Sequence, residues 1–418
     1  MEPDIRKGLE GVIADRTAVS RMDPATQTLT YRGYPVTDLA ERCGFEEVAY
    51  LLWNGELPTR AQLKAFQAAE RRQRALPDEL QHLLGHCPPG AHPMDLLRTA
   101  VSYLGMTVPV ARDPESQHRQ TMDLLAKIPT VIAFDARSRQ GLQPIPPRTD
   151  LPFCDNMFWM TFGRVPHPDV VKAFEVALIL YAEHGFNAST FAARVVTSTM
   201  ADLHGAVTAG IAALKGTLHG GANEAVIADL SEVGAPENVR PWLKARLAER
   251  RKIMGFGHRV YRNGDSRVPL AAKWGRRVAE IVGNPHWHSI ADVLRDAMRE
   301  EKGIHPNLDF ETGPMYSLMG FAPAQFTPIF VMGRVVGWTA HILEQAADNR
   351  LIRPMSTYAG VPMRPFVSIE RREAPSTDAL PVSARPRVRP RILGGPHHVP
   401  AGPLHPVMPQ RERPATLR

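Results

Sequence analysis

One stretch of the chain, from Val170 to Ala182, is apolar on almost every face when its residues are placed on a helix. A helix at a protein surface keeps one polar face, so a helix with this sequence (VVKAFEVALILYA) has to be surrounded by other helices. With 418 residues, of which 44% are hydrophobic, the chain can build a core large enough to enclose it. We therefore predict an all-α fold, as one large domain or two of moderate size.

Local patterns predict further helices on both sides of this segment. The spacing of Phe45, Val48 and Leu52 predicts a helix that ends near Gly55, and Thr59 with Gln62 is a capping-box pattern at the start of the next helix. Further helices are expected at 201–214, 241–251, 269–282 and 290–299.

Two short segments are expected to be non-helical. The opening stretch alternates like a β-hairpin, with Val12, Ala14 and Val19 in one run and Leu29, Tyr31 and Tyr34 in the next. The HWH sequence at 286–288 follows Pro285 and is expected to form a surface turn.

A change in composition suggests a domain boundary. Residues 224–302 are more charged than the segments around them, as in a smaller domain inserted into a larger one. We predict a large helical domain from 1–222 and 313–369 and a small helical domain from 223–312. The Pro- and Arg-rich tail, 370–418, has few large apolar residues, so we expect it to be disordered.

The positive charge of the chain is concentrated in this tail. The formal net charge is +7, and the segment from Arg371 onward holds nine arginines against three acidic residues. The remaining body is nearly neutral, which favours a solvated basic tail over a nucleic-acid-binding arm. Three scattered cysteines, no signal-like N-terminus and no run of 18 apolar residues predict a cytoplasmic protein that spans no membrane.

Three unusual motifs contain candidate catalytic side chains: His219 in LHGGAN, His258 in GFGHRVY and Asp309 in PNLDF. Two imidazoles and a carboxylate suit the removal of a proton beside a carbonyl and the stabilisation of the resulting enolate. Taken alone, each motif is also compatible with a structural role, as a histidine at a glycine-rich helix start, a solvated basic loop or a helix-capping aspartate.

Other residues narrow the choice of chemistry. Arg334 lies in an otherwise apolar helix, where an unpaired charge is costly, so we expect it to have an anionic partner. The histidines lack the spacing of a zinc site, and no GxSxG motif is present, so metal and serine-hydrolase chemistry are not indicated.

Taken together and in order, the motifs resemble the citrate synthase family, including the 2-methylcitrate synthases. The resemblance covers residues 7–369 and includes KGLEGVIADRTAVS, EHGFNASTFAARVVTST, LHGGANEAV, KIMGFGHRVYRNGDSR, PNLDFETG and FTPIFVMGRVVGWTAHILEQ. It implies a two-domain helical homodimer that condenses an acyl-CoA with oxaloacetate and water, and that uses no metal or redox cofactor. The segments YAEHGFNASTFAARVVTST and GDSRVP are most similar to those of actinobacterial 2-methylcitrate synthases. This similarity slightly favours propionyl-CoA over acetyl-CoA as the acyl donor.

The resemblance also implies roles for individual residues. Asp309 matches the base, His219 the residue that binds the thioester oxygen, and His258 the residue that polarises the ketone. Contacts to oxaloacetate or citrate are implied for five residues, with Arg353 reaching in from a partner subunit: His184, Arg267, Phe330, Arg334 and Arg353. Contacts to CoA are implied for six residues: Lys252, Ile253, Met254, Gly255, Phe256 and Arg262.

The chain departs from the common family pattern at three positions. Gly185 replaces a frequent carboxylate after the first histidine, Ser266 stands in an Asp-Pro-Arg motif, and Met355 replaces a second arginine. These changes leave the three catalytic positions intact but put the CoA and effector contacts in doubt. The alternative reading is a non-catalytic sensor that binds CoA or a dicarboxylate on the same fold.

Overall fold

The computed structural model of the chain describes residues 5–23, 25–111, 113–257, 261 and 264–372. The chain divides into two units, which are residues 14–352 with 403–418, and residues 1–13 with 353–402. In its described part, the second unit contains only two short 3-10 turns, Lys7–Leu9 and Ile369–Arg371. The first unit contains the helices and the sheet described below.

A small antiparallel sheet opens the first unit. Strand β1 (Ser20–Asp23) pairs with β2 (Thr28–Tyr31), and β2 pairs with β3 (Tyr34–Pro35). A hairpin forms as predicted, as the β1–β2 pair that contains Leu29 and Tyr31. However, Val12, Ala14 and Val19 all precede β1, and Tyr34 belongs to β3, which was not expected. The buried hydroxyl of Tyr31 lies 3.0 Å from the carbonyl oxygens of Ile179 and Glu183, which attaches the sheet to the last turn of the buried helix and to the segment that follows it.

The predicted all-α character is confirmed. The first ten helices are α1 (Val36–Arg42), α2 (Phe45–Asn54), α3 (Arg60–Arg72), α4 (Asp78–Gly85), α5 (Pro93–Met106), α6 (Pro114–Ser138), α7 (Phe153–Phe162), α8 (Pro168–Tyr181), α9 (Ala188–Ser198) and α10 (Leu203–Leu214). The others are α11 (Ala222–Val233), α12 (Val239–Ala248), α13 (Val268–Val282), α14 (His286–Lys302), α15 (Leu308–Leu318) and α16 (Phe326–Ala347), with 3-10 turns at Pro236–Asn238 and Pro323–Gln325.

Several predicted helix ends are confirmed. Helix α2 ends at Asn54, and Gly55 follows in the left-handed conformation with φ of 90°, which glycine adopts without steric cost. Thr59 and Gln62 form the predicted capping box, in which the Thr59 amide donates to the Gln62 side chain over 2.9 Å.

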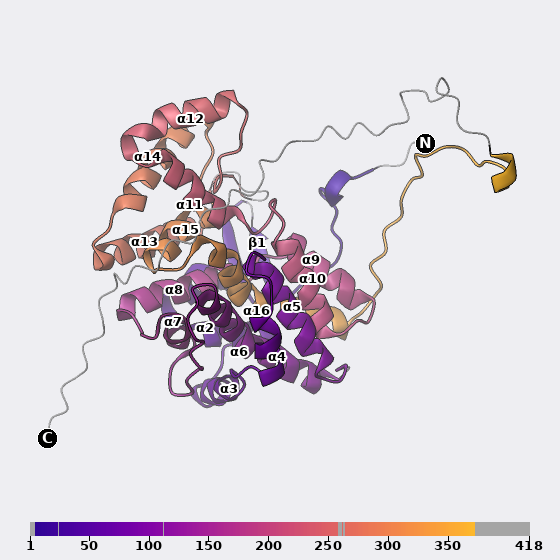
Figure 1. Cartoon of the computed structure of the whole chain (residues 1–418), viewed down its shortest axis with the longest axis horizontal. Helices are drawn as coiled ribbons and strands as arrows, with labels where there is room; N and C mark the ends of the chain where they lie inside the picture. Colours follow the sequence, from indigo (N-terminus) through magenta and orange to yellow (C-terminus); the bar gives the residue numbers. More distant parts are fainter. Residues whose placement is uncertain (1–4, 24, 112, 258–260, 262–263, 373–418) are drawn as a thin grey trace. The chain divides into compact units, whose positions relative to one another are not determined.

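Helix α16 forms the centre of the core and packs against α2, α6, α8, α9 and α10 (Figure 1). Within the described residues, the segment Pro323–Ala347 is long and apolar enough to cross a membrane by length and composition. However, 94% of its apolar window is buried inside the protein, and the core helix of a globular protein meets the same criteria. Its burial explains why the chain needs a nearly all-apolar sequence here.

The prediction of a surface turn at 286–288 is wrong. These residues form the first turn of α14, and His288 is 6% exposed. The side chain of Asn284 accepts a hydrogen bond from the His286 amide over 3.1 Å, and His288, Ile290 and Leu294 all lie on the buried side of the helix. The helix therefore begins about one turn before the predicted start at residue 290.

The division into a large and a small domain stays a prediction. Helices α11 to α15 pack on one another, with α13 and α15 lying between α12 and α14 and the rest of the helical unit (Figure 1). Most of the predicted tail, residues 373–418, lies outside the described residues.

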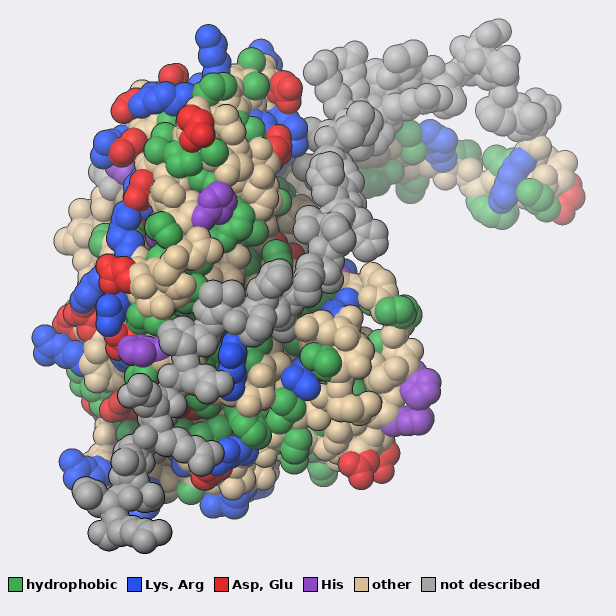
Figure 2. All heavy atoms as spheres, turned by 60° about the vertical axis from the view of Figure 1, so that its left-hand side comes forward, with side chains coloured by type: hydrophobic (Ala, Val, Ile, Leu, Met, Phe, Trp, Pro, Cys, Tyr) green, Lys and Arg blue, Asp and Glu red, His purple; other side chains and the backbone are tan. Residues whose placement is uncertain are grey.

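Charges of both signs are mixed on the surface. On the face shown in Figure 2, basic and acidic side chains are interspersed among apolar and uncharged ones. Exposed ion pairs among the described residues include Arg276 with Asp292 and Arg277 with Asp169. The mixture agrees with the nearly neutral body inferred from the sequence.

Candidate active site

The carboxyl end of α8 is the point at which several predicted site residues meet. The last carbonyl groups of a helix have no partner within it, and here two arginines use them. Nη1 of Arg267 donates to the Leu180 carbonyl over 3.1 Å, and Nε of Arg334 donates to the Tyr181 carbonyl over 2.6 Å. The Tyr181 hydroxyl donates to Oδ1 of Asp309 over 2.6 Å.

Asp309 is the second residue of α15. The side chain of Asn307 caps this helix and accepts a hydrogen bond from the Asp309 amide over 3.1 Å. Burial raises the pKa of Asp309 to about 6, although the hydrogen bond from Tyr181 and the positive charge of Arg267 oppose the shift. The carboxylate thus combines a fixed position with the basicity that proton abstraction near neutral pH requires.

His219 lies in the turn before α11 and contacts the start of α9. The Ser189 amide donates to Nε2 of His219 over 3.2 Å, and the Ser189 hydroxyl lies 2.8 Å from the same nitrogen. Because a backbone amide can only donate, Nε2 is an acceptor and the neutral ring carries its proton on Nδ1. Burial, assisted by the charge of Arg334, lowers the pKa of His219 to about 4, so the ring is neutral at neutral pH.

Arg334 lies inside the protein and has no carboxylate partner among the described residues. It is 2% exposed, and its guanidinium carbon lies 4.8 Å from the centre of the Phe330 ring. No carboxylate in the described part of the chain forms an ion pair with it, so the anionic partner expected from the sequence is not supplied by these residues. A buried cation of this kind is suited to receive an anionic ligand.

Arg267, in contrast, already has a carboxylate partner. Its Nη2 and Nε lie 2.6 and 2.9 Å from the Asp265 carboxylate, and both residues are 5% exposed. Asp265 and the other nearby groups hold the pKa of Arg267 above its ordinary value despite burial. The two charges of the pair act on the pKa of Asp309 in opposite directions, with Arg267 lowering it and Asp265 raising it.

His184 follows the buried network of α8 directly. It is 7% exposed, and its ring lies 5.6 Å from the ring of Tyr261. The preceding residue, Glu183, lies 2.8 Å from Nε2 of His341 and accepts a hydrogen bond from Ser20 over 2.9 Å. The backbone that carries His184 is therefore attached to both the sheet and α16.

The loop 252–256, expected to bind CoA, is bonded to the segment that carries Asp309. The Asn307 amide donates to the Gly255 carbonyl over 2.9 Å, and the Phe256 and Phe310 rings lie 4.6 Å apart. Gly255 has a φ of 79°, and a Cβ atom there would lie 2.6 Å from Val226. Only glycine fits this close approach, which brings the loop onto α15.

Three of the predicted site residues are not part of the arrangement described above. His258 and Arg262 lie outside the described residues. Arg353 is exposed and belongs to the second unit, whereas the other described site residues belong to the first.

Three residues of the site were not predicted from the sequence: Tyr181, Ser189 and Glu183. Tyr181 carries the one hydroxyl in the apolar run 170–182, and Glu183 stands directly before His184, so both offered a signal. Ser189 offered none, because it meets His219 through its amide and its hydroxyl only once the chain is folded, across 30 positions of the sequence.

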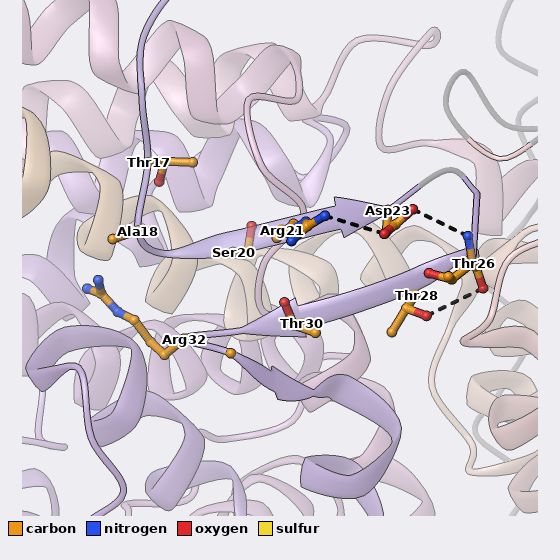
Figure 3. Close-up of a pocket in the computed structure, with 10 residues that line it drawn as sticks. Thr17, Ala18, Ser20, Arg21, Asp23, Thr26, Thr28, Thr30 and Arg32 are labelled. Carbon is orange, nitrogen blue, oxygen red and sulfur yellow. Dashed lines mark hydrogen bonds and ion pairs between the residues drawn. The ribbon is translucent and has the colours of Figure 1, made fainter.

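A separate hollow of about 490 Å³ lies along the sheet rather than at Asp309 or His219. Figure 3 shows it lined by hydroxyl side chains, including Thr28 and Thr30, together with Arg21 and Asp23.

In the described ranges, no group of three His, Cys, Asp or Glu side chains is arranged to hold a metal ion.

The sequence is similar to known enzymes along most of its length. The sequence profile of the citrate synthase family, described as "Citrate synthase, C-terminal domain", matches residues 8–355. A 2-methylcitrate synthase of Mycobacterium tuberculosis is 56% identical over 358 residues, which are 86% of this chain and 91% of that protein. A citrate synthase of Mycolicibacterium smegmatis is 54% identical over 368 residues, which are 87% of this chain and 98% of that protein.

Solved structures show the same fold. The citrate synthase of Thermotoga maritima has a TM-score of 0.80 at 38% identity, covering 88% of this chain and 100% of that one. The citrate synthase of Thermoplasma acidophilum, solved with carboxymethyl coenzyme A and oxaloacetate, has a TM-score of 0.84 at 30% identity, with coverage of 88% and 100%. The relatives are named as enzymes, which does not favour the sensor alternative. This chain belongs to the citrate synthase family.

Proposed function

We propose that this chain condenses an acyl-CoA with oxaloacetate and water to give citrate or 2-methylcitrate and free CoA. The structural observation that carries the proposal is the buried guanidinium of Arg334, which has no ion pair among the described residues and donates to the same residue, Tyr181, that holds Asp309. An anion site and a base are thereby connected through one residue. Such an arrangement can bind an electrophile through its carboxylate and remove a proton from the carbon of a second substrate.

In this proposal, Asp309 removes a proton from the α-carbon of the thioester. Nδ1–H of His219 then donates a hydrogen bond to the thioester oxygen and stabilises the enol, since its Nε2 is already occupied by Ser189. The enol carbon attacks the ketone carbon of oxaloacetate and forms the new carbon–carbon bond. His258, which lies outside the described residues, polarises this ketone and protonates the alkoxide that the attack produces. Water hydrolyses the resulting thioester and releases CoA.

The remaining residues are proposed to bind the two substrates. Arg334 and Arg353 pair with carboxylates of oxaloacetate, while Arg267, His184 and Phe330 line its site. The loop 252–256 holds the adenine of CoA, and Arg262 contacts a phosphate. The proposed reaction uses no metal or redox cofactor, so turnover should persist in the presence of a chelator.

Release of free thiol tests the reaction. The protein is incubated with oxaloacetate and either acetyl-CoA or propionyl-CoA, and CoA is followed with a thiol reagent. Release that depends on oxaloacetate is expected with at least one thioester, and its absence with both would refute the proposal.

We propose propionyl-CoA as the preferred acyl donor. Relatives named 2-methylcitrate synthase and citrate synthase match at 56% and 54% identity, so overall similarity separates the two donors poorly. One methylene changes binding by only about 1 to 3 kcal/mol. The ratio of kcat/KM for the two thioesters decides the preference, and a ratio in favour of acetyl-CoA would reverse it.

We further propose that the enzyme is a cytoplasmic homodimer in which Arg353 completes the site of the partner subunit. Large apolar side chains of the second unit are exposed, including Met355 at 92%, Met363 at 101% and Phe366 at 85%, and a second copy would cover them.

Mixing two inactive variants tests the exchange of Arg353. Asp309→Asn and Arg353→Ala are expected to be inactive alone, and subunit exchange between them should restore activity. A hybrid dimer then has one site with both residues intact only if Arg353 acts across the interface. No recovery in a mixture that forms hybrid dimers would place Arg353 in its own subunit's site.

A further inference from the structure

We infer that Tyr181, supported by Thr312, is a positioning residue that orients the Asp309 carboxylate and keeps it ionised for proton abstraction. This inference rests on the proposed function and adds a role for residues to which no role has been assigned. Tyr181 is 2% exposed and Thr312 is fully buried, so water does not compete for either hydroxyl.

The hydrogen bonds between Thr312, Tyr181 and Asp309 run in one direction. The Tyr181 hydroxyl lies 2.6 Å from Oδ1 of Asp309 and 2.6 Å from Oγ1 of Thr312. A phenol has one proton, and an ionised carboxylate can only accept, so Tyr181 donates to Asp309. Oγ1 of Thr312 also lies 3.2 Å from the Leu308 carbonyl oxygen, a longer contact than the 2.6 Å to Tyr181. With the Tyr181 proton directed to Asp309, the shorter contact requires Thr312 to donate to Tyr181, which polarises the phenol and strengthens its bond to the carboxylate.

The hydrogen bonds from Thr312 to Tyr181 to Asp309 fix one carboxylate oxygen of the base and leave the other available. With Oδ1 held by Tyr181, and the Asp309 amide held by Asn307, the carboxylate is fixed at both ends of the residue. Oδ2 is then the oxygen available to accept the proton of the substrate. Fixing the orientation of a base in advance lowers the entropic cost of reaching the transition state.

The backbone of Tyr181 performs a second task. Its carbonyl accepts the hydrogen bond from Nε of Arg334, so a single residue holds the base through its side chain and the anion-binding guanidinium through its backbone. Removing only the hydroxyl should therefore impair proton abstraction and leave oxaloacetate binding intact.

The charge environment of Asp309 includes groups from several elements. Burial raises its pKa, while the hydrogen bond from Tyr181 opposes this shift, as do two arginines. Five charged or titratable groups of the described residues interact electrostatically with the Asp309 carboxylate. They are Tyr181 on α8, Asp265 and Arg267 before α13, Tyr316 on α15 and Arg334 on α16. Among these groups, Tyr181 contributes the only side-chain hydrogen bond to the carboxylate that the described residues show.

Four variants test the inference through the pH dependence of kcat/KM. Tyr181→Phe should lower kcat about 10- to 100-fold, leave the KM for oxaloacetate unchanged, and move the acid limb to higher pH by about one unit. Thr312→Val should produce a smaller shift in the same direction, whereas Thr312→Ser should restore the wild-type profile because it keeps the hydroxyl.

Tyr316→Phe is the matched control. Tyr316 is a fully buried tyrosine near the same carboxylate, but its hydroxyl has no hydrogen-bond partner among the described residues. Its substitution should leave the acid limb in place. Equal profiles for wild type and Tyr181→Phe, or equal shifts for Thr312→Val and Thr312→Ser, would overturn the inference.

An infrared titration of the Asp309 carboxyl separates this inference from the proposed reaction. Spectra of wild type, Tyr181→Phe and Thr312→Val are recorded against pH, and the spectrum of Asp309→Asn is subtracted to isolate the band. The carboxyl should titrate at higher pH in both variants, and this result requires no turnover. An unshifted band would refute the role of Tyr181 even if CoA release proves the reaction.

Discussion

The backbone amide of Ser189 donates a hydrogen bond to Nε2 of His219 over 3.2 Å. This amide stands in the first turn of α9, where backbone N–H groups lack partners within the helix. The contact leaves the proton of the neutral imidazole on Nδ1. His219 can therefore donate a hydrogen bond from Nδ1 while its ring stays uncharged.

Replacing His219 with alanine should therefore remove a hydrogen bond to the developing enolate. We expect His219→Ala to lower kcat about 10²- to 10³-fold, as loss of an oxyanion donor does. The acid limb of kcat/KM near pH 6 should remain, because burial gives Asp309 a pKa of about 6 and lowers that of His219 to about 4. Disappearance of the limb in the variant would assign it to the imidazole. Exposed His286→Ala serves as the control.

Asp309→Asn should abolish turnover and retain binding of oxaloacetate. The amide has a similar size and keeps the helix start, but it cannot accept a proton from the substrate. Isothermal titration should give a dissociation constant for oxaloacetate close to that of wild type, while thiol release falls to background. Asp296→Asn, on the exposed face of α14, is the matched control. Turnover retained in Asp309→Asn would mean that another group is the base.

Arg334→Met and Arg194→Met should have opposite consequences for stability. Both arginines are at most 2% exposed, but Arg194 pairs with Glu344 at 2.8 Å and Asp15 at 3.2 Å. We expect Arg194→Met to lower the free energy of unfolding by about 2 to 4 kcal/mol because it leaves its partners unpaired. Arg334→Met should keep or raise the free energy of unfolding in the absence of ligand.

The same Arg334→Met variant should bind oxaloacetate poorly. Loss of a charged hydrogen bond to a carboxylate predicts a rise in KM of about 10- to 100-fold. Denaturant unfolding and steady-state kinetics check the two effects. A strongly destabilised Arg334→Met protein would show that Arg334 supports the fold rather than a ligand.

Glu46 makes stability depend on pH. It is 4% exposed, and burial, assisted by the nearby Glu175, raises its pKa from 4.5 to about 7. The folded state therefore binds this proton more tightly than the unfolded chain, so the stabilisation is complete below about pH 4.5 and is lost as pH rises through about 7.

Glu46→Gln keeps the shape of the protonated side chain and cannot ionise. At pH 8 its free energy of unfolding should exceed that of wild type by roughly 3 kcal/mol, and the difference should vanish near pH 4. Denaturant titrations at several pH values measure the difference, with the exposed Glu56→Gln as the control. A difference that does not change with pH would contradict the buried-acid explanation.

The sequence by itself determined the features that depend on neighbouring residues. The apolar run that ends at Ala182 became the buried helix α8, Gly55 ended α2, and Thr59 with Gln62 formed a capping box. Each depends on contacts within one or two helical turns, which periodicity and side-chain chemistry reveal directly. The ordered motifs also identified the family, because their combination is specific even where each motif alone is ambiguous.

Only the tertiary structure decided how the site residues are held. Tyr181 meets Asp309 across 128 positions of the chain, and Ser189 meets His219 across 30. These contacts fix the orientation of the base and the tautomer of the imidazole. They depend on how α8, α9, α15 and α16 pack around a common core, and no pattern of nearby residues contains that information.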